Sequence, residues 1–104
     1  MKLSTTDEIA GEEIAETLGL VRGNTIRARH LGRDFMAGLR NLVGGEIKDY
    51  TEMLSEARDE AVERLIEEAE GLDADAVVEL RFTTSQTMGG AAEILAYGTA
   101  VKFK

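Results

Sequence analysis

The sequence holds few side chains suited to nucleophilic or soft-metal chemistry. It has no cysteine and a single histidine, His30. Zinc and similar cations need about four nitrogen or sulfur ligands, so one imidazole per chain contributes to such a site only where symmetry brings several copies together. We therefore predict no metal site, with His30 as a weak candidate only, and expect this residue to be a solvent-facing or hydrogen-bonded turn residue.

A second polar group is acidic and lies along one face of a predicted long helix. Carboxylates are ligands for hard cations, but Ca²⁺ needs six to eight oxygens that converge from a bent loop. A straight helix directs its side chains apart, so the better interpretation is a solvated acidic face. The residues of this face are Glu52, Glu56, Asp59, Glu60, Glu63, Glu67 and Glu70.

A third group is basic and is confined to residues 20–45. Five arginines stand there against one aspartate, so this segment carries +4 while the rest of the chain carries −12. Aromatic residues make up only 5% of the chain, too few for the stacking platforms of a nucleic-acid-binding protein. We expect the arginines to pair with carboxylates, partly across subunit contacts. They are Arg22, Arg27, Arg29, Arg33 and Arg40.

No arrangement of a nucleophile with a base is visible. Ser4, Ser55 and Ser85 have no motif around them, and a lone histidine is a poor basis for a triad. The segment Gly44–Glu46 lacks the Lys-Ser/Thr of a phosphate loop, and its acidic residue would repel an anion, so it is better interpreted as a helix breaker. The sequence thus predicts no catalytic residue, no cofactor and no enzyme.

The long helix is the element whose start, body and end can all be predicted from neighbouring residues in the sequence. Asp49 is a suitable N-cap with Glu52 three residues later, and Gly71 is placed for a left-handed C-terminal residue. Between them, Tyr50–Glu70 predicts a helix of about 21 residues. Its apolar stripe has a spacing of three or four and consists of Tyr50, Leu54, Ala57, Ala61, Leu65 and Ala69.

The N-terminal part is harder to assign. Lys2–Thr5 predicts a short strand, and Asp7–Leu20 fits either a helix with a capping box or a strand. Gly23-Asn24 indicates a turn before a second run, Thr25–His30. Leu31–Val43 then predicts a short helix.

The C-terminal part predicts two strands joined by a turn at Gly89-Gly90. In the first strand, Ala76, Val78, Leu80 and Phe82 alternate with other residues and predict one apolar face. The second strand, Glu93–Phe103, is apolar on both faces. Its bulky side is Leu95, Tyr97, Thr99, Val101 and Phe103, and its small side is Ile94, Ala96, Gly98 and Ala100.

A strand with two apolar faces needs two covers. We expect the small side to take the long helix, with Gly98 close to Ala57 and Ala61. The bulky side needs another cover, and a second subunit is the simplest candidate.

The chain length, the lengths of the apolar stretches and the net charge limit the class of protein. With 104 residues the chain is expected to be one domain, 1–104. No stretch approaches the roughly 18 apolar residues of a membrane span, and no signal sequence opens the chain, which predicts a cytoplasmic protein without a membrane partner. The net charge of −8 fits a high-salt cytoplasm and an ordinary acidic protein equally well.

Four stretches, in order along the chain, resemble the YbjQ-like family. They are Gly19–Gly23; Arg33-Asp34-Phe35 with Ala37 through Gly45; Tyr50-Thr51 with Leu54, Arg58 and Ala61; and Ala74–Val78 with Tyr97–Val101. The family carries a heavy-metal-binding label, and its activity is not established. The absence of cysteine and the single histidine set this chain at odds with that label.

The resemblance implies a two-layer α+β fold of the YbjQ or dodecin-like kind, with an antiparallel sheet, one long helix and one short helix. It implies that Glu13–Val21 is a strand, against the local helix signal. It also implies a cyclic homo-oligomer, a pentameric ring or a pair of such rings, in which short extra strands join the subunits.

Three functional hypotheses follow. The leading one is a non-catalytic, ring-forming binding or scaffold protein whose partner is itself, without nucleic acid and with no ligand named. The alternatives are a metal-ion-binding protein and an enzyme with its site at subunit junctions. The residues expected to pack the helix on the sheet are Tyr50, Leu54, Ala57, Ala61, Leu65 and Gly98, and the expected subunit contacts are Arg22, Arg33, Arg40 and Tyr97.

Overall fold

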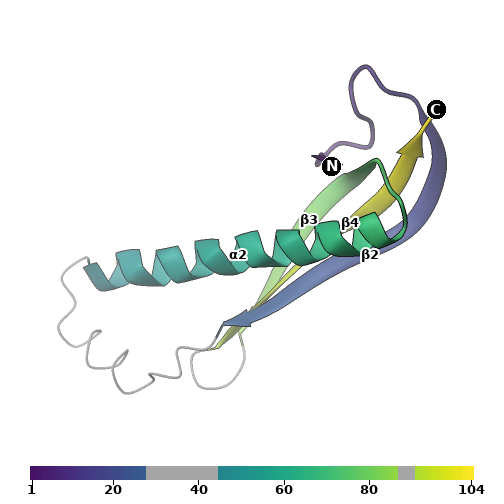
Figure 1. Ribbon diagram of the computed structural model, residues 1–104. Helices are drawn as coiled ribbons and strands as arrows, with labels where there is room; N and C mark the ends of the chain where they lie inside the picture. Colours follow the sequence, from purple (N-terminus) through teal and green to yellow (C-terminus); the bar gives the residue numbers. More distant parts are fainter. Residues whose placement is uncertain (28–44, 87–90) are drawn as a thin grey trace.

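The computed structural model describes residues 1–27, 45–86 and 91–104 (Figure 1). The elements in chain order are β1 (Lys2–Leu3), β2 (Ile14–Arg27), α2 (Gly45–Gly71), β3 (Ala76–Gln86) and β4 (Ala92–Phe103). The predicted short helix and the Gly89-Gly90 turn lie outside the described residues. The predicted long helix and the two C-terminal strands are present.

The four strands form one sheet in the order β1-β3-β4-β2. Strands β2, β4 and β3 are antiparallel neighbours, but β1 runs parallel to β3, with Lys2 opposite Ala76 and Leu3 opposite Val77. The sheet is therefore mixed, and the antiparallel arrangement that the resemblance implied holds for β2, β4 and β3 but not for β1. A parallel pair needs a long connection, and β2 together with α2 supplies it here.

Strand β2 is continuous over 14 residues. The strand implied for Glu13–Val21 is confirmed from Ile14 onward, and the helical alternative for Asp7–Leu20 is wrong. The predicted turn at Gly23-Asn24 is also wrong, because both residues pair within the ladder, opposite Ala96 and Leu95. Glycine stands at position 23 for a different reason, which is its closeness to α2.

Helix α2 spans 27 residues and begins at Gly45, so Asp49 lies inside the helix and is not its N-cap. At the other end the left-handed residue is Asp73, at φ 60°, and not Gly71. The amide of Ala74 donates to Ala69 O at 3.1 Å and that of Asp73 to Glu70 O at 3.0 Å. This pair of bonds is a Schellman motif displaced by two residues from the predicted glycine.

A bulge in β3 changes which face its side chains occupy. The pairing with β4 shifts between Val78 and Arg81, and Glu79 adopts φ 54°. The amides of Glu79 and Leu80 instead donate to Thr6 O and Ser4 O, both at 2.9 Å. Because an extra residue reverses the alternation, the single apolar face predicted for residues 76–82 is wrong.

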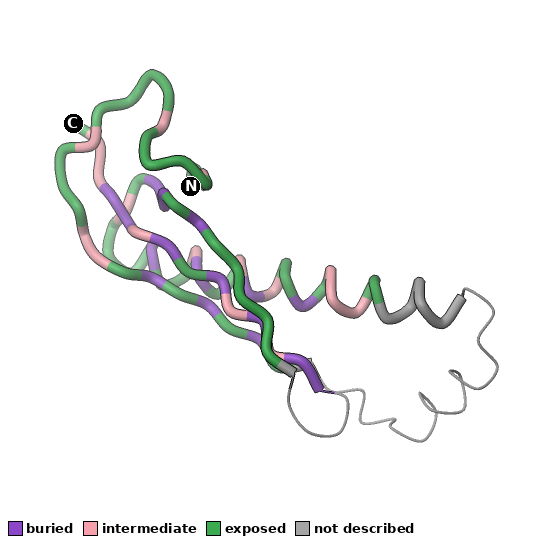
Figure 2. The backbone as a smooth tube through the Cα atoms, turned by 180° about the vertical axis from the view of Figure 1, so that it is seen from behind, coloured by how far each residue is buried: buried purple, intermediate pink, exposed green. Residues whose placement is uncertain are grey.

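The main core lies between α2 and one face of the sheet, as Figure 1 shows. Strands and helix alternate between buried and exposed positions along their length (Figure 2). The buried members of this core are Val21, Ala57, Ala61, Leu65, Ala69, Val77, Leu80, Ile94, Ala96 and Ala100. The radius of gyration is 17.1 Å, against about 13 Å for a compact chain of this length, so the chain is elongated.

Candidate functional site

The two faces of the sheet differ in what covers them. We call the face under α2 the helix-side face and the opposite one the open face. Cross-strand partners share a face, so the pairing register places side chains of the open face in rows across β2, β4 and β3. Three such rows are Arg22–Tyr97–Arg81, Asn24–Leu95–Thr83 and Ile26–Glu93–Ser85.

One end of the open face is covered by the N-terminal segment. Ile9 and Ile14 pack there on a small cluster made by Ala76, Val78 and Val101. Lys104 N donates to Glu13 O at 2.9 Å, which helps to hold this segment beside the end of β4. Of the three rows, this segment contacts the first one through Thr5, whose backbone oxygen accepts from Arg81.

The rest of the open face exposes apolar side chains. Leu20 is 64% exposed, Ile26 62% and Tyr97 36%, and Leu95 is half-buried. Large apolar side chains gathered on one surface are typical of an interaction site, whereas single ones need no explanation. A hollow of about 330 Å³ lies on the same face. It is lined by four side chains from β2 and β4: Arg22, Asn24, Glu93 and Leu95.

Charges of both signs lie on this face. Arg22 is exposed and has no hydrogen-bond or ion-pair partner among the described residues. Arg81 is anchored, because its Nη1 donates to Thr5 O at 2.8 Å and to Leu80 O at 3.0 Å. Glu93 Oε2 accepts from Asn24 Nδ2 at 3.4 Å. The open face therefore combines apolar, cationic and anionic groups.

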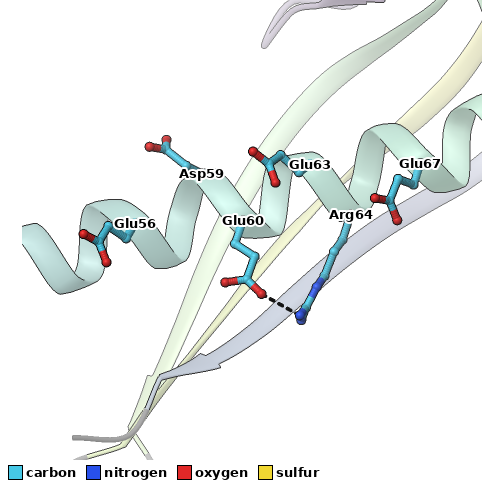
Figure 3. Close-up of a pocket in the computed structure, with 6 residues that line it drawn as sticks. All are labelled: Glu56, Asp59, Glu60, Glu63, Arg64 and Glu67. Carbon is cyan, nitrogen blue, oxygen red and sulfur yellow. Dashed lines mark hydrogen bonds and ion pairs between the residues drawn. The ribbon is translucent and has the colours of Figure 1, made fainter.

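A second hollow, of about 470 Å³, lies along α2, and two of its lining side chains, Glu60 and Arg64, point toward β2 (Figure 3). Arg64 forms an ion pair with Glu60, and its Nη1 donates to Asn24 O in β2 at 2.6 Å. The carboxylates come from successive turns of one straight helix. The lining residues are Glu56, Asp59, Glu60, Glu63, Arg64 and Glu67.

A metal site needs several ligand side chains grouped in space. Within residues 1–27, 45–86 and 91–104, no three or more His, Asp or Glu side chains are grouped so that they could hold a metal ion. His30 lies outside these residues, so the prediction about it stays a prediction. The described donor set does not fit a heavy-metal centre.

The helix residues that were predicted to pack on the sheet lie against the helix-side face of the sheet, where the structure describes their side chains. Ala57, Ala61 and Leu65 are fully buried, and Leu54 packs against the same core. Tyr50 lies in α2, but its side chain is outside what the structure describes.

Gly98 is close to a neighbour, but that neighbour is not the helix. A Cβ at this position would lie 2.6 Å from Val77 Cγ1 and 3.0 Å from Val78 O, both in β3. The glycine that meets the helix is Gly23, where a Cβ would lie 2.2 Å from Ala61 O and 2.4 Å from Leu65 N. The expected partner of Gly98 is thus corrected from α2 to β3.

Of the predicted subunit contacts, the structure places Arg22 and Tyr97 opposite each other in one row of the open face. Arg33 and Arg40 lie outside the described residues. Arg81, which completes the row, was not predicted. No local signal identifies it, because its face depends on the bulge in β3.

The fold is a two-layer α+β protein with one long helix packed across a mixed sheet. The helix of the described residues is not apolar enough to cross a membrane. The chain belongs to the YbjQ family, since the family model described as "Putative heavy-metal-binding" matches residues 1–104. The resemblance seen in the sequence is thereby confirmed.

Relatives match along the whole chain. A UPF0145 protein of Halorubrum lacusprofundi is 62% identical over 104 residues, which is all of both chains. One of Methanosarcina acetivorans is 62% identical over 102 residues, covering 98% of this chain and 96% of the relative. A crystal structure of a protein of unknown function from Pediococcus pentosaceus, of the DUF74 family, has a TM-score of 0.68 at 21% identity. It covers 100% of this chain and 98% of its own, and supports the fold.

Proposed function

We propose that this protein is a non-catalytic scaffold or binding protein whose copies assemble into a closed ring. The observation that carries the proposal is a sheet with two different open edges. The acidic composition, without cysteine and without a nucleophile motif, supports a role that needs no reaction chemistry.

The first open edge belongs to β2. This strand is last in the sheet order and pairs only with β4 among the described residues. Arg64 occupies one backbone carbonyl along it, that of Asn24. Strand β2 has 14 residues, and a strand edge with which no described strand pairs is a template for pairing with another chain.

The second open edge is the outer half of β3. The backbone of the N-terminal segment pairs with β3 only as far as Leu80, through β1 and through Ser4 O and Thr6 O, which accept from the amides of Leu80 and Glu79. From Arg81 to Gln86, no strand of the described chain pairs with the side of β3 away from β4.

Pairing of the β2 edge with the β3 edge of the next copy is a head-to-tail contact between two different surfaces. Such contacts close into a ring when the rotation per copy divides a full turn, and a closed ring leaves no edge exposed. The elongated protomer, with its radius of gyration of 17.1 Å, suits a part of a larger assembly. A pentamer, or a pair of pentamers, is the assembly we propose.

Light scattering behind size exclusion, at low and molar salt, measures the mass directly. We expect five times the chain mass of 11.3 kDa, or a multiple of that. A monomer at micromolar concentration in both conditions would refute the ring.

Cysteine cross-linking tests the edges, and the chain offers a clean background because it has no cysteine. In one chain Asn24 and Thr83 are separated by β4, which is two strand spacings or about 9.6 Å. A disulfide needs Cα atoms within about 7 Å, so Asn24→Cys/Thr83→Cys can be bridged only between chains.

Under mild oxidation the double variant should give a ladder of covalent species longer than two chains. Either single variant is the matched control, because one cysteine per chain can join two chains at most. Since the register between chains is open, Arg81→Cys and Ser85→Cys replace Thr83→Cys in parallel. Failure of all three combinations to pass beyond dimers would contradict the edge pairing.

A further inference from the structure

We infer that the open face is a second self-association surface, on which two copies pack sheet against sheet about a two-fold axis. This inference rests on the proposed self-assembly and names a contact separate from the edges. It is carried by the pairing register, the exposed apolar side chains and the two signs of charge on one face.

Two surfaces of another copy could cover the open face: the outer side of its α2, or its own open face. The side chains of the open face favour the second. The outer side of α2 on another copy is acidic, with Asp59, Glu63 and Glu67 all exposed. Packing Leu20, Ile26 and Leu95 there would desolvate carboxylates against apolar groups, which costs free energy unless each charge finds a partner. A second open face instead offers apolar groups to apolar groups.

The register makes the face complementary to itself. The row Arg22–Tyr97–Arg81 and the row Ile26–Glu93–Ser85 lie on either side of the row that contains Leu95. A two-fold axis that lies between two stacked sheets and runs across the strands at Leu95 exchanges these two outer rows. Each then faces the other row of the second copy.

In that arrangement Glu93 of one copy lies over Tyr97 of the other, between Arg22 and Arg81. Stacked sheets are about 10 Å apart, a distance that an arginine and a glutamate span together. Leu95 meets its own equivalent at the axis, and Ile26 lies over the stem of Arg22. The carboxylate is thus placed between two guanidinium groups, one of which has no partner in the described chain.

The contact has a consequence for the size of the assembly. A two-fold contact uses the same surface on both copies and joins them in pairs, so the number of chains must be even. Applied to a five-membered ring, it gives ten chains in two rings.

Charge reversal tests the contact. Arg22→Glu places a carboxylate beside Glu93 of the other copy, and Glu93→Arg places a guanidinium between Arg22 and Arg81. We expect each variant to halve the mass measured by native mass spectrometry or light scattering. The control is Glu63→Arg, a charge reversal on the outer side of α2, which should leave the mass unchanged.

The double variant Arg22→Glu/Glu93→Arg separates pairing from damage to the fold. Within one chain the two residues are about 13 Å apart along the strands, so direct compensation has to come from another chain. We expect the double variant to regain the full mass in part, because Arg81 still faces the new arginine. Circular dichroism with urea unfolding at matched concentrations checks that the single variants remain folded.

The outcomes distinguish this contact from the ring. A five-fold mass that Arg22→Glu does not change would refute the two-fold contact and leave the ring standing. A dimer that Arg22→Glu converts to a monomer would support the contact and refute the ring. A folded Arg22→Glu protein with the parent's mass, or a double variant no better than the worse single one, would overturn the inference.

Discussion

The two faces of this sheet are built from the same three strands, but they differ in the size of the side chains that the strands present. On the helix-side face β2 and β4 present small residues, among them Gly23, Ala96 and Ala100, and the backbone of α2 lies directly on Gly23. On the open face the same strands present long or bulky side chains, among them Arg22 and Tyr97, which remain accessible to solvent.

The comparison shows that residue size marks the two kinds of contact. Small residues allow backbones to approach, and this closeness tolerates no added atom. Bulky and charged residues on an exposed sheet face keep another surface at side-chain distance and bind it through groups that can adjust. Substitutions on the helix-side face should therefore act on folding, whereas those on the open face should act on assembly.

The largest expected effect is that of Gly23→Ala. The new Cβ would meet helix backbone, Ala61 O at 2.2 Å and Leu65 N at 2.4 Å, so α2 as a whole must move away. We expect a loss of about 3 kcal/mol or more in the free energy of unfolding, at the upper end of overpacking effects. Urea denaturation at a fixed protein concentration measures it.

The matched control is the next residue, Asn24→Ala, whose side chain lies on the open face. Surface substitutions usually change stability within about 0.5 kcal/mol. Equal effects of the two variants would break the distinction between the faces.

A moderate effect is expected for Gly98→Ala, about 1–3 kcal/mol, because the first obstacle is the Cγ1 of Val77 and a side chain yields more easily than backbone. The double variant Gly98→Ala/Val77→Ala sharpens the assignment. Since Val77→Ala removes the clashing methyl group, its own cost and that of Gly98→Ala should not add. Simple additivity of the two costs would indicate that the neighbour of Gly98 is not Val77.

The smallest effect has the opposite sign. Thr25 is 2% exposed on the helix-side face, and its Oγ1 has no hydrogen-bond partner among the described residues. Thr25→Val replaces an unpaired buried hydroxyl with a methyl group of similar size, and should stabilise the protein by about 1 kcal/mol. Thermal melts of this variant and of Ile26→Val, its neighbour on the open face, measure the difference. A lower midpoint for Thr25→Val would indicate that the hydroxyl has a partner.

The sequence by itself determined the features that local periodicity and composition encode. The spacing of Leu54, Ala57, Ala61 and Leu65 predicts a helix with one buried face, and the structure has α2 there. The alternation of small and bulky residues in β4 indicates a strand with two different faces. Both patterns are found again in the structure, because the period of a helix or a strand depends only on the local sequence.

The tertiary structure decided what depends on pairing between distant segments. The bulge at Glu79 moves Leu80 to the helix-side face and Arg81 to the open face, and it lies where β3 meets the N-terminal segment. Gly23 is followed by Asn24, a pair typical of turns, but it lies in a strand. A glycine is needed there because the backbone of α2, some 40 residues further along the chain, leaves no room for a side chain. The row Arg22–Tyr97–Arg81 arises only when three strands are in register, since a shift of one residue would turn each side chain to the other face.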